Sequence, residues 1–434
     1  MPSLASLLPL ALLPAAVFAA PFTPEQSSAM RLTGRALASA RGNLTLMERI
    51  GRDLSGLEGK LKHLDLDEDA VRRAGDKLTK RSVIVPIANL ITNYALMTHA
   101  GNITIGTPAQ TLSVAFDTGS YDLIMPVTCT NGCPNSYFKT AASSSFSNLS
   151  TPADTGYAGG AYASGDAASE RVSIGPYTQD AQRFLAATEY HSDVVENHAG
   201  IFGLAPYSRS AVGGFSFVDN LVTQGALQNN LFSTWFRDST THGSEVVIDG
   251  VDSTKYSGEF THVPVLGGVG YWLIATESYS WQGRPLDNTA GITLVDSGTS
   301  WNYIPRATAA ALAAKHSGKI VETRPWTLLG QNVEVDIYQI ACRFPIQSGL
   351  GFRFKGQSSS TPLAMWPQDN IGEIEYAADG TQKCYASFFG VDLTYAGQPA
   401  SLLGLAFLES FYTVWSYGAS GEDLSMSFAR ANLS

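Results

Sequence analysis

Short runs of alternating apolar and polar positions fill residues 82–434, and Gly, Ser, Asn and Pro separate the runs. Examples of such runs are Thr111–Phe116, Arg171–Ile174, Glu245–Ile248 and Tyr412–Trp415. Helical patterns are few here, and they cover Phe217–Gln224, Ala307–Lys315 and a short stretch at Phe407–Ser410. Regularly spaced strands with few helices predict an all-β protein with sandwich or barrel-like sheets.

Residues 21–81 follow a different pattern. Apolar residues recur there at spacings of three and four, at Met47, Ile50, Leu54, Leu57, Leu61 and Leu64. This spacing predicts an amphipathic helix, although glycines within the stripe weaken it. The segment ends at the basic pair Lys80-Arg81, and a strand-like run follows at once. We interpret the pair as a processing site between a propeptide and a β domain; the alternative is an ordinary solvated pair.

An internal repeat organises the β region. Residues 112–120 read LSVAFDTGS, and residues 292–300 read ITLVDSGTS. In each copy an apolar run ends in an aspartate, so Asp117 and Asp296 correspond to each other. An apolar-apolar-Gly segment follows each turn, as GIFGLA at 200–205 and LLGLAF at 402–407. The repeat predicts two similar lobes, joined near Gly250–Pro264, with one site at the seam.

Charge and composition narrow the class of protein. Charged residues make up 15% of the chain and the formal net charge is −10, without a clustered basic patch. A nucleic-acid partner is therefore not expected. Residues 1–81 hold 12 basic and 9 acidic side chains, and the remainder holds 16 and 29. Opposite charges would hold the propeptide on the β domain near neutral pH, and acid would loosen it.

The first 20 residues are apolar and end in small residues. This pattern predicts a secretory signal peptide over 1–20, and a membrane anchor is the alternative. No later stretch is long and apolar enough to span a membrane. The expected location is extracellular, with the vacuole as the alternative. Sequons stand at Asn43, Asn102, Asn148 and Asn432 as candidate N-glycosylation sites.

Four cysteines fit an oxidising compartment. They fall as Cys129 and Cys133, then Cys342 and Cys384. Three connectivities are open, and pairing between neighbours is the simplest because each lobe then folds without the other. Zinc is a poor alternative because the spacing matches no zinc motif. We expect no metal and no cofactor.

Two aspartates on matching turns suggest acid–base hydrolysis. Cleaving a peptide without a metal or a nucleophile needs a base that activates water and an acid that protonates the amide. Two close carboxyl groups that share one proton supply both. The glycines Gly119 and Gly298 let the turns approach each other. The nearby hydroxyls can fix the carboxylates by hydrogen bonds; they belong to Thr118, Ser120, Ser297, Thr299 and Ser300. Motifs of serine hydrolases, zinc proteases and nucleotide-binding proteins are missing from the sequence.

With these motifs, residues 82–434 resemble the pepsin family of aspartic endopeptidases, especially its secreted fungal members. The resemblance implies two pseudo-two-fold related β lobes, 82–255 and 256–434, with a cleft between them and a hairpin flap above it. Tyr157 takes the place of the flap tyrosine, and Gly159 and Ile201 are expected to contact the substrate. In related zymogens a propeptide lysine pairs with the aspartates, and Lys77 or Lys80 is a candidate for that role.

Several positions depart from the family pattern. Ile124 stands where a tryptophan usually supports the flap tyrosine, and Ala158 replaces a usual glycine. Leu405 and Ala199 stand where many relatives have aspartate. We therefore keep two hypotheses. The leading one is a secreted, monomeric acid endopeptidase that is made as a zymogen and cuts protein or peptide substrates. The alternative is a catalytically impaired binding or inhibitor-like protein on the same fold, against which the two intact Asp-x-Gly turns argue.

Overall fold

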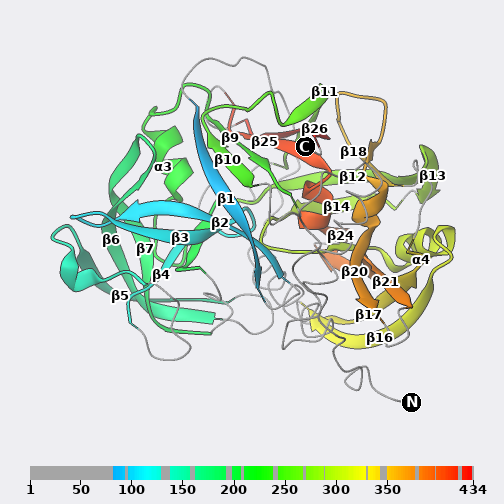
Figure 1. Ribbon diagram of the computed structural model, residues 1–434, viewed down its shortest axis with the longest axis horizontal. Coiled ribbons are helices and arrows are strands. Elements are labelled where there is room, and N and C mark those ends of the chain that lie inside the picture. The colour runs from blue at the N-terminus through cyan, green and yellow to red at the C-terminus, as the bar shows by residue number, and fades with distance from the viewer. Residues whose placement is uncertain are drawn as a thin grey trace, which may run out of the picture.

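The computed structural model describes residues 82–92, 96–128, 137–156, 162–191, 198–206, 210–237, 243–266, 270–287, 289–328, 331–342, 349–376, 381–395, 397–418 and 423–432. These residues fold into two large β-sheets with a few short helices (Figure 1). The expected all-β architecture is confirmed.

The first sheet holds most of the first half of the chain. Its strand order is β11-β26-β25-β9-β10-β1-β2-β3-β8-β4-β7-β6-β5. The strands are β1 Val83–Thr92, β2 Leu96–Ile105, β3 Gln110–Asp117, β4 Leu123–Pro126, β5 Ser147–Gly156, β6 Tyr162–Ile174, β7 Tyr177–Tyr190, β8 Ile201–Gly203, β9 Leu231–Trp235, β10 Ser244–Ile248, β11 Tyr256–Pro264, β25 Phe411–Ser416 and β26 Ser425–Ala431.

The second sheet is built from the second half. Its main path is β19-β18-β12-β14-β24-β15-β22-β17-β21-β20, with β13, β16 and β23 paired beside it. The strands are β12 Leu273–Trp281, β13 Arg284–Asp287, β14 Gly291–Val295, β15 Asn302–Ile304, β16 Lys319–Leu328, β17 Gln331–Ile340, β18 Leu350–Phe354, β19 Leu363–Ala364, β20 Ile371–Tyr376, β21 Gln382–Ala386, β22 Phe388–Val391, β23 Leu393–Tyr395 and β24 Gln398–Leu403.

The internal repeat reappears as strand pairing. The paths β3-β8-β4-β7-β6-β5 and β14-β24-β15-β22-β17-β16 share one order of pairs: parallel, antiparallel, parallel, antiparallel, antiparallel. Ile124 pairs with Leu185, and in the second half Tyr303 pairs with Phe389 at the same place. The hairpin β5–β6 thus has the hairpin β16–β17 as its counterpart, and Figure 1 shows them at the lower left and lower right.

The C-terminal strands do not stay in the second sheet. β25 and β26 pair with β9 and β11 in the first sheet, next to β10 and β1 (Figure 1). The hydrogen bonds of one sheet therefore join strands from both ends of the described chain. The predicted boundary between 255 and 256 falls just before β11, and the division of the chain at that point stays a prediction.

Aromatic side chains fill the core where these strands meet. Trp272 and Trp415 are fully buried and pack edge to face, and Phe232 stacks on Trp415. The indole N–H of Trp272 donates to the carbonyl oxygen of Leu204 at 2.9 Å, so no polar atom of this ring is left unpaired. Burying one such ring contributes roughly 1.5–3 kcal/mol or more.

Short helices cover the sheets. They are α3 Phe217–Thr223, α4 Arg306–Lys315 and α5 Leu405–Leu408, with 3-10 turns η3 Thr140–Ala142 and η6 Pro367–Asn370. Ser216 caps α3, because its hydroxyl accepts the backbone N–H of Asp219. The three helical patterns in the sequence are confirmed within a few residues. Within the described residues, no helix is long and apolar enough to cross a membrane.

Candidate active site

The two repeated aspartates stand at equivalent ends of two strands. Asp117 is the last residue of β3, and Asp296 follows the last residue of β14. In each half the strand runs parallel to the strand of the apolar-apolar-Gly segment. The N–H of Leu204 donates to the carbonyl of Asp117 at 2.8 Å, and the N–H of Asp296 donates to the carbonyl of Leu403 at 2.9 Å.

Each carboxylate accepts a matched pair of hydrogen bonds from its own turn. Asp117 accepts the N–H of Gly119 at 2.8 Å and the hydroxyl of Ser120 at 2.6 Å. Asp296 accepts the N–H of Gly298 at 2.9 Å and the hydroxyl of Thr299 at 2.6 Å. The shared pattern fixes the two side chains in equivalent orientations. Both aspartates are buried, with 5% and 0% of their surfaces exposed.

A reciprocal pair of hydrogen bonds locks the turns to each other. The N–H of Thr118 donates to the hydroxyl of Ser297, and the N–H of Ser297 donates to the hydroxyl of Thr118, both at 2.9 Å. The Ser297 hydroxyl also donates to the carbonyl of Phe116, and the Thr118 hydroxyl donates to that of Val295. These two hydroxyls therefore join the two halves.

Glycine is required where the turns touch. A Cβ atom on Gly298 would lie 2.3 Å from Oδ1 of Asp117, which places that carboxylate directly against the second turn. On Gly203 and Gly404, a Cβ atom would lie 2.3 and 2.4 Å from backbone atoms of Tyr121 and Thr299. The glycine of each apolar-apolar-Gly segment thus allows two backbones to approach closely.

The other predicted active-site residues that the structure describes are all buried, but their contacts differ. Ser300 is buried and its hydroxyl has no hydrogen-bond partner among the described residues. Ile201 is 8% exposed and pairs with Ala115 on β3. Ala115 precedes the first aspartate by two residues. Ile124 is fully buried among apolar side chains. Leu405 is buried as well, and its N–H donates to the carbonyl of Thr299.

Several predictions fall outside the described residues. They concern the flap residues Tyr157, Ala158 and Gly159, the cysteines Cys129 and Cys133, the processing pair Lys80 and Arg81, Lys77 and the sequon at Asn43. The hairpin strands on either side of the flap residues are described up to Gly156 and from Tyr162.

The second cysteine pair forms the expected disulfide. Cys342 and Cys384 are bonded, with their Cα atoms 5.3 Å apart. Among the sequons, the side chain of Asn102 is exposed, and Asn148 is exposed but donates to Asp166. Asn432 donates both amide hydrogens to backbone carbonyls, so its side chain is already engaged.

Sequence reasoning missed Asp122, which lies close to the first turn. Its carboxylate is buried and accepts the hydroxyl of Ser210 and the N–H of Ala211. Burial raises the pKa of Asp122 above its usual value, while these hydrogen bonds oppose the shift. Its partners lie almost 90 residues further along the chain, so no local pattern marked it. Across the described residues, no cluster of three or more potential metal ligands occurs.

Residues 98–429 match the family model of the eukaryotic aspartyl proteases. The chain therefore belongs to this pepsin-like family. An aspartic protease of Phaffia rhodozyma is 29% identical over 322 residues, covering 73% of each chain. Pepsin A of Sus scrofa is 30% identical over 329 residues, which cover 74% of this chain and 80% of that protein. Pregnancy-associated glycoprotein 2 of Bos taurus is 28% identical over 342 residues, with coverages of 75% and 90%.

Proposed function

We propose that the protein is an aspartic endopeptidase of the secreted fungal type, which hydrolyses peptide bonds of proteins at acid pH. One observation carries the proposal. Asp117 and Asp296 accept equivalent hydrogen bonds from turns that are locked together by Thr118 and Ser297. A site kept only for binding has no need of two matched, buried carboxylates.

The chemistry follows from this arrangement. Two carboxyl groups in close proximity hold one proton between them, since ionising both is costly. The ionised aspartate accepts a proton from a water molecule as that water attacks the peptide carbonyl. The protonated aspartate donates to the carbonyl oxygen, and the amide nitrogen then takes a proton as it leaves. The turn hydrogen bonds hold both carboxylates still, so little reorganisation is needed during the reaction.

The remaining parts of the proposal concern maturation and location. Residues 1–20 act as a signal peptide, and 21–81 act as a propeptide that is removed after Lys80-Arg81. The mature enzyme has an N-terminal lobe over 82–255 and a C-terminal lobe over 256–434. It acts as a monomer, because one chain supplies both aspartates, and it is secreted or reaches the vacuole. Its substrates are proteins and peptides.

A binding protein on the same fold is the second candidate. One relative bears the name of a glycoprotein and not of a protease, so family membership alone does not establish catalysis. Ile124 also removes the N–H donor that the family resemblance assigns to flap support. The intact turn geometry of both aspartates favours the enzyme.

The deciding experiment is casein digestion by the 82–434 form between about pH 3 and pH 6, beside Asp117→Asn and Asp296→Asn. We expect the wild type to cleave casein and a statine-type peptide to inhibit this cleavage. Both variants should show no cleavage. If the folded wild type is as inactive as the variants, the binding-protein reading replaces it.

A further inference from the structure

Trp272 contacts the backbone on both sides of the site, and it uses a different end of the residue for each. Its carbonyl oxygen accepts the N–H of Val295, the last residue of β14, at 3.1 Å. Its indole N–H donates to the carbonyl of Leu204, directly after β8, at 2.9 Å. Val295 precedes Asp296 in the chain, and the N–H of Leu204 donates to the carbonyl of Asp117 at 2.8 Å. Each aspartate is therefore linked to Trp272 through a single residue.

The backbone and the side chain of Trp272 belong to different parts of the fold. The residue directly precedes β12, and the next residue, Leu273, pairs with Leu294 on β14 in the second sheet. The indole ring instead contacts Phe232 on β9 and Trp415 on β25, which are strands of the first sheet. A movement of one sheet against the other would therefore displace this residue.

The ring has little freedom to move. Trp272 is fully buried. Three aromatic rings meet it edge to face at centroid distances of 5.9, 5.2 and 5.6 Å, and they belong to Phe232, Trp415 and Tyr417. Aromatic pairs in this geometry attract each other beyond the area that they bury. The carbonyl of Leu204 is therefore held in a fixed position relative to β14.

This link is separate from the reciprocal hydrogen bonds between Thr118 and Ser297. Those bonds join the two turns at one place, and a single point of contact leaves two bodies free to rotate about it. Trp272 adds a second connection, which acts through β14 on one side and through Leu204 on the other. Two connections fix the angle between the turns as well as their distance.

We propose that Trp272 is a positioning residue for catalysis, which sets the separation and the angle of the carboxyl groups of Asp117 and Asp296. This proposal rests on the proposed function. Trp272 does not touch the substrate, because it acts through Leu204 and Val295. Position matters here because two carboxyl groups share one proton only at close range, and a misplacement of about 1 Å can lower a rate about 100-fold.

The test is Trp272→Phe, with Trp415→Phe as the matched control. Both tryptophans are fully buried in one aromatic cluster, and each donates its indole N–H to a single acceptor. Trp415 donates to the hydroxyl of Thr234 at 3.0 Å, and Thr234 on β9 pairs with Val246 and Thr413. The two changes thus remove the same ring and the same kind of hydrogen bond. Both should lower the urea midpoint by similar amounts.

Steady-state kinetics on one peptide substrate should separate the two variants. Trp272→Phe is expected to lower kcat about 10- to 100-fold and to leave KM within about twofold, because it disturbs the reacting groups and not substrate binding. Trp415→Phe should keep kcat within about twofold of the wild type. Each variant is expressed as the full chain and assayed after the same processing.

The pH profile of kcat/KM gives a readout that a loss of stability alone would not move. Two interacting carboxyl groups titrate at two separated values, and the separation shrinks as the groups move apart. The turns already touch, since a Cβ atom on Gly298 would lie 2.3 Å from the Asp117 carboxylate, so a released turn can only move away. The profile of Trp272→Phe should therefore be narrower than those of the wild type and Trp415→Phe. The other titratable side chains near this link are the same in all three proteins; they are Tyr121, Asp122, Tyr271 and Tyr417.

A second variant separates the lost N–H from the lost volume, and it also serves if Trp272→Phe fails to fold. Replacing Trp272 with β-(benzothiophen-3-yl)alanine by amber suppression keeps the bicyclic ring and exchanges the N–H group for sulfur. We expect the same fall in kcat and the same narrower pH profile. The same replacement at Trp415 should change neither.

Three outcomes would overturn the proposal. They are an unchanged kcat in Trp272→Phe, equal losses of kcat in the Trp272 and Trp415 variants, and full activity of the benzothiophene variant at position 272. Absence of hydrolysis by the wild type would instead contradict the proposed function. In that case the carboxyl carbons of Asp117 and Asp296 are titrated by NMR in the wild type and in Trp272→Phe. An unchanged pair of apparent pKa values then rejects the positioning role.

Discussion

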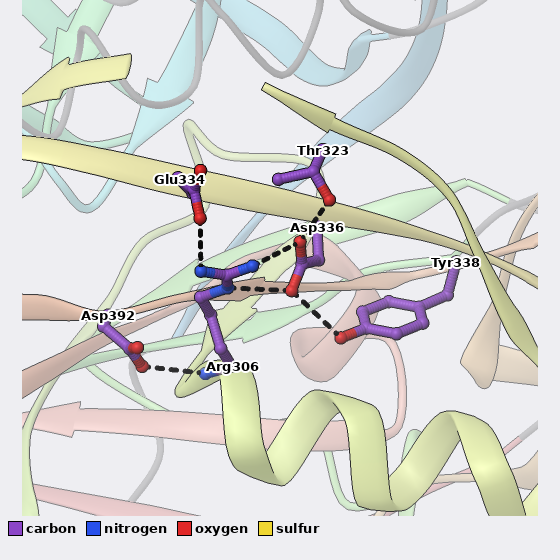
Figure 2. A network of polar contacts seen from close by, with 6 residues as sticks. All are labelled: Arg306, Thr323, Glu334, Asp336, Tyr338 and Asp392. Atoms are coloured by element: carbon purple, nitrogen blue, oxygen red, sulfur yellow. Dashed lines mark hydrogen bonds and ion pairs between the residues drawn. The ribbon is translucent and has the colours of Figure 1, made fainter. Parts of the chain in front are cut away.

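The hairpins β5–β6 and β16–β17 occupy equivalent places in the two halves, but their side-chain contacts differ. The first contributes the small side chains of Ala153, Ala163 and Ala167 to an apolar cluster that also contains Ile124, Leu185 and Ile201. The second is fastened by charge, because Arg306 at the start of α4 binds Asp336 on β17 with two hydrogen bonds of 2.8 and 2.9 Å (Figure 2). Alanine contacts are non-directional and small, whereas a bidentate pair fixes both distance and angle.

The ion pair between Arg306 and Asp336 belongs to a larger network of polar contacts. Arg306 also donates to Glu334 at 2.7 Å, and its backbone N–H donates to Asp392 at 3.0 Å (Figure 2). Thr323 on β16 donates to Asp336 at 2.6 Å, so both strands of the hairpin and the helix are joined. The hydrogen bonds to Asp336 raise the pKa of Arg306 still further, so this cation stays charged at any working pH.

The comparison shows that the same strand topology is held by different side chains in the two halves. The hairpin β5–β6 packs through small apolar side chains, and β6 is also paired along β7 and accepts the hydroxyls of Ser143 and Ser145 at the buried Glu170. The hairpin in the other half is held in one position beside α4. Both halves nevertheless share the same active-site turn, hydrogen bond for hydrogen bond. The active-site turns are therefore matched in their hydrogen bonds, whereas the two hairpins differ in the side chains that hold them.

The largest expected effect comes from disturbing the contact between the turns. In Gly298→Ala the new Cβ atom would clash with the Asp117 carboxylate at 2.3 Å. Displacing that group by about 1 Å should lower kcat about 100-fold or more. Steady-state kinetics on one peptide gives the value. Gly156→Ala at the end of β5 is the control, since no atom of the described residues lies within 4 Å of its Cβ position. Equal kcat values for Gly298→Ala and the wild type would contradict the close approach.

Removing the hydroxyl of either Thr118 or Ser297 should destabilise the protein by a similar amount, because the two residues exchange a pair of hydrogen bonds. Ser297→Ala leaves the buried N–H of Thr118 without its acceptor, and Thr118→Val does the same to Ser297. Each should cost about 2–3 kcal/mol of unfolding free energy. The double variant should cost clearly less than the sum, because the two hydroxyls serve one contact. Urea unfolding measures all three, and simple additivity would show that the halves are not locked here.

Much of this site followed from the sequence, because a repeat reveals equivalence without any structure. The aspartates, their glycines and the role of the apolar-apolar-Gly segments were predictable in this way. Thr118 and Ser297 were expected to bind the carboxylates, but they join the turns, since side-chain direction across a seam is not encoded locally. The entry of β25 and β26 into the first sheet and the clamps at Arg306 and Asp122 depend on pairing between distant segments, which no local pattern contains.

Removing the Arg306–Asp336 ion pair should destabilise the hairpin β16–β17 and leave the hairpin β5–β6 unaffected. Arg306→Met removes both bonds to Asp336 and leaves that carboxylate buried without its cation. The cost should be about 2 kcal/mol, less than for a fully buried pair because Arg306 is about a third exposed. Hydrogen exchange should rise along β16–β17 and stay unchanged along β5–β6. Arg353→Met is the matched control, since its pair with Glu277 is at the surface and should contribute less than about 1 kcal/mol.

The smallest expected effect concerns the sheet where strands from both ends of the chain meet. Glu245 on β10 is buried, and burial together with the nearby charge of Asp252 raises its pKa to about 7, although Lys255 opposes the shift. The folded protein therefore binds this proton more tightly than the unfolded chain does. Stability from this group is present below about pH 4.5 and is lost as the pH rises toward 7.

Glu245→Gln keeps the shape of the side chain and cannot ionise. Between pH 4.5 and pH 7 the unfolding free energy of the wild type should therefore fall by about 1–2 kcal/mol more than that of the variant. Urea unfolding at several pH values tests this, and parallel curves for the two proteins would rule out Glu245 as the source. Because this sheet pairs strands from both ends of the described chain, its loosening toward neutral pH would affect both ends together, unlike a change at either hairpin.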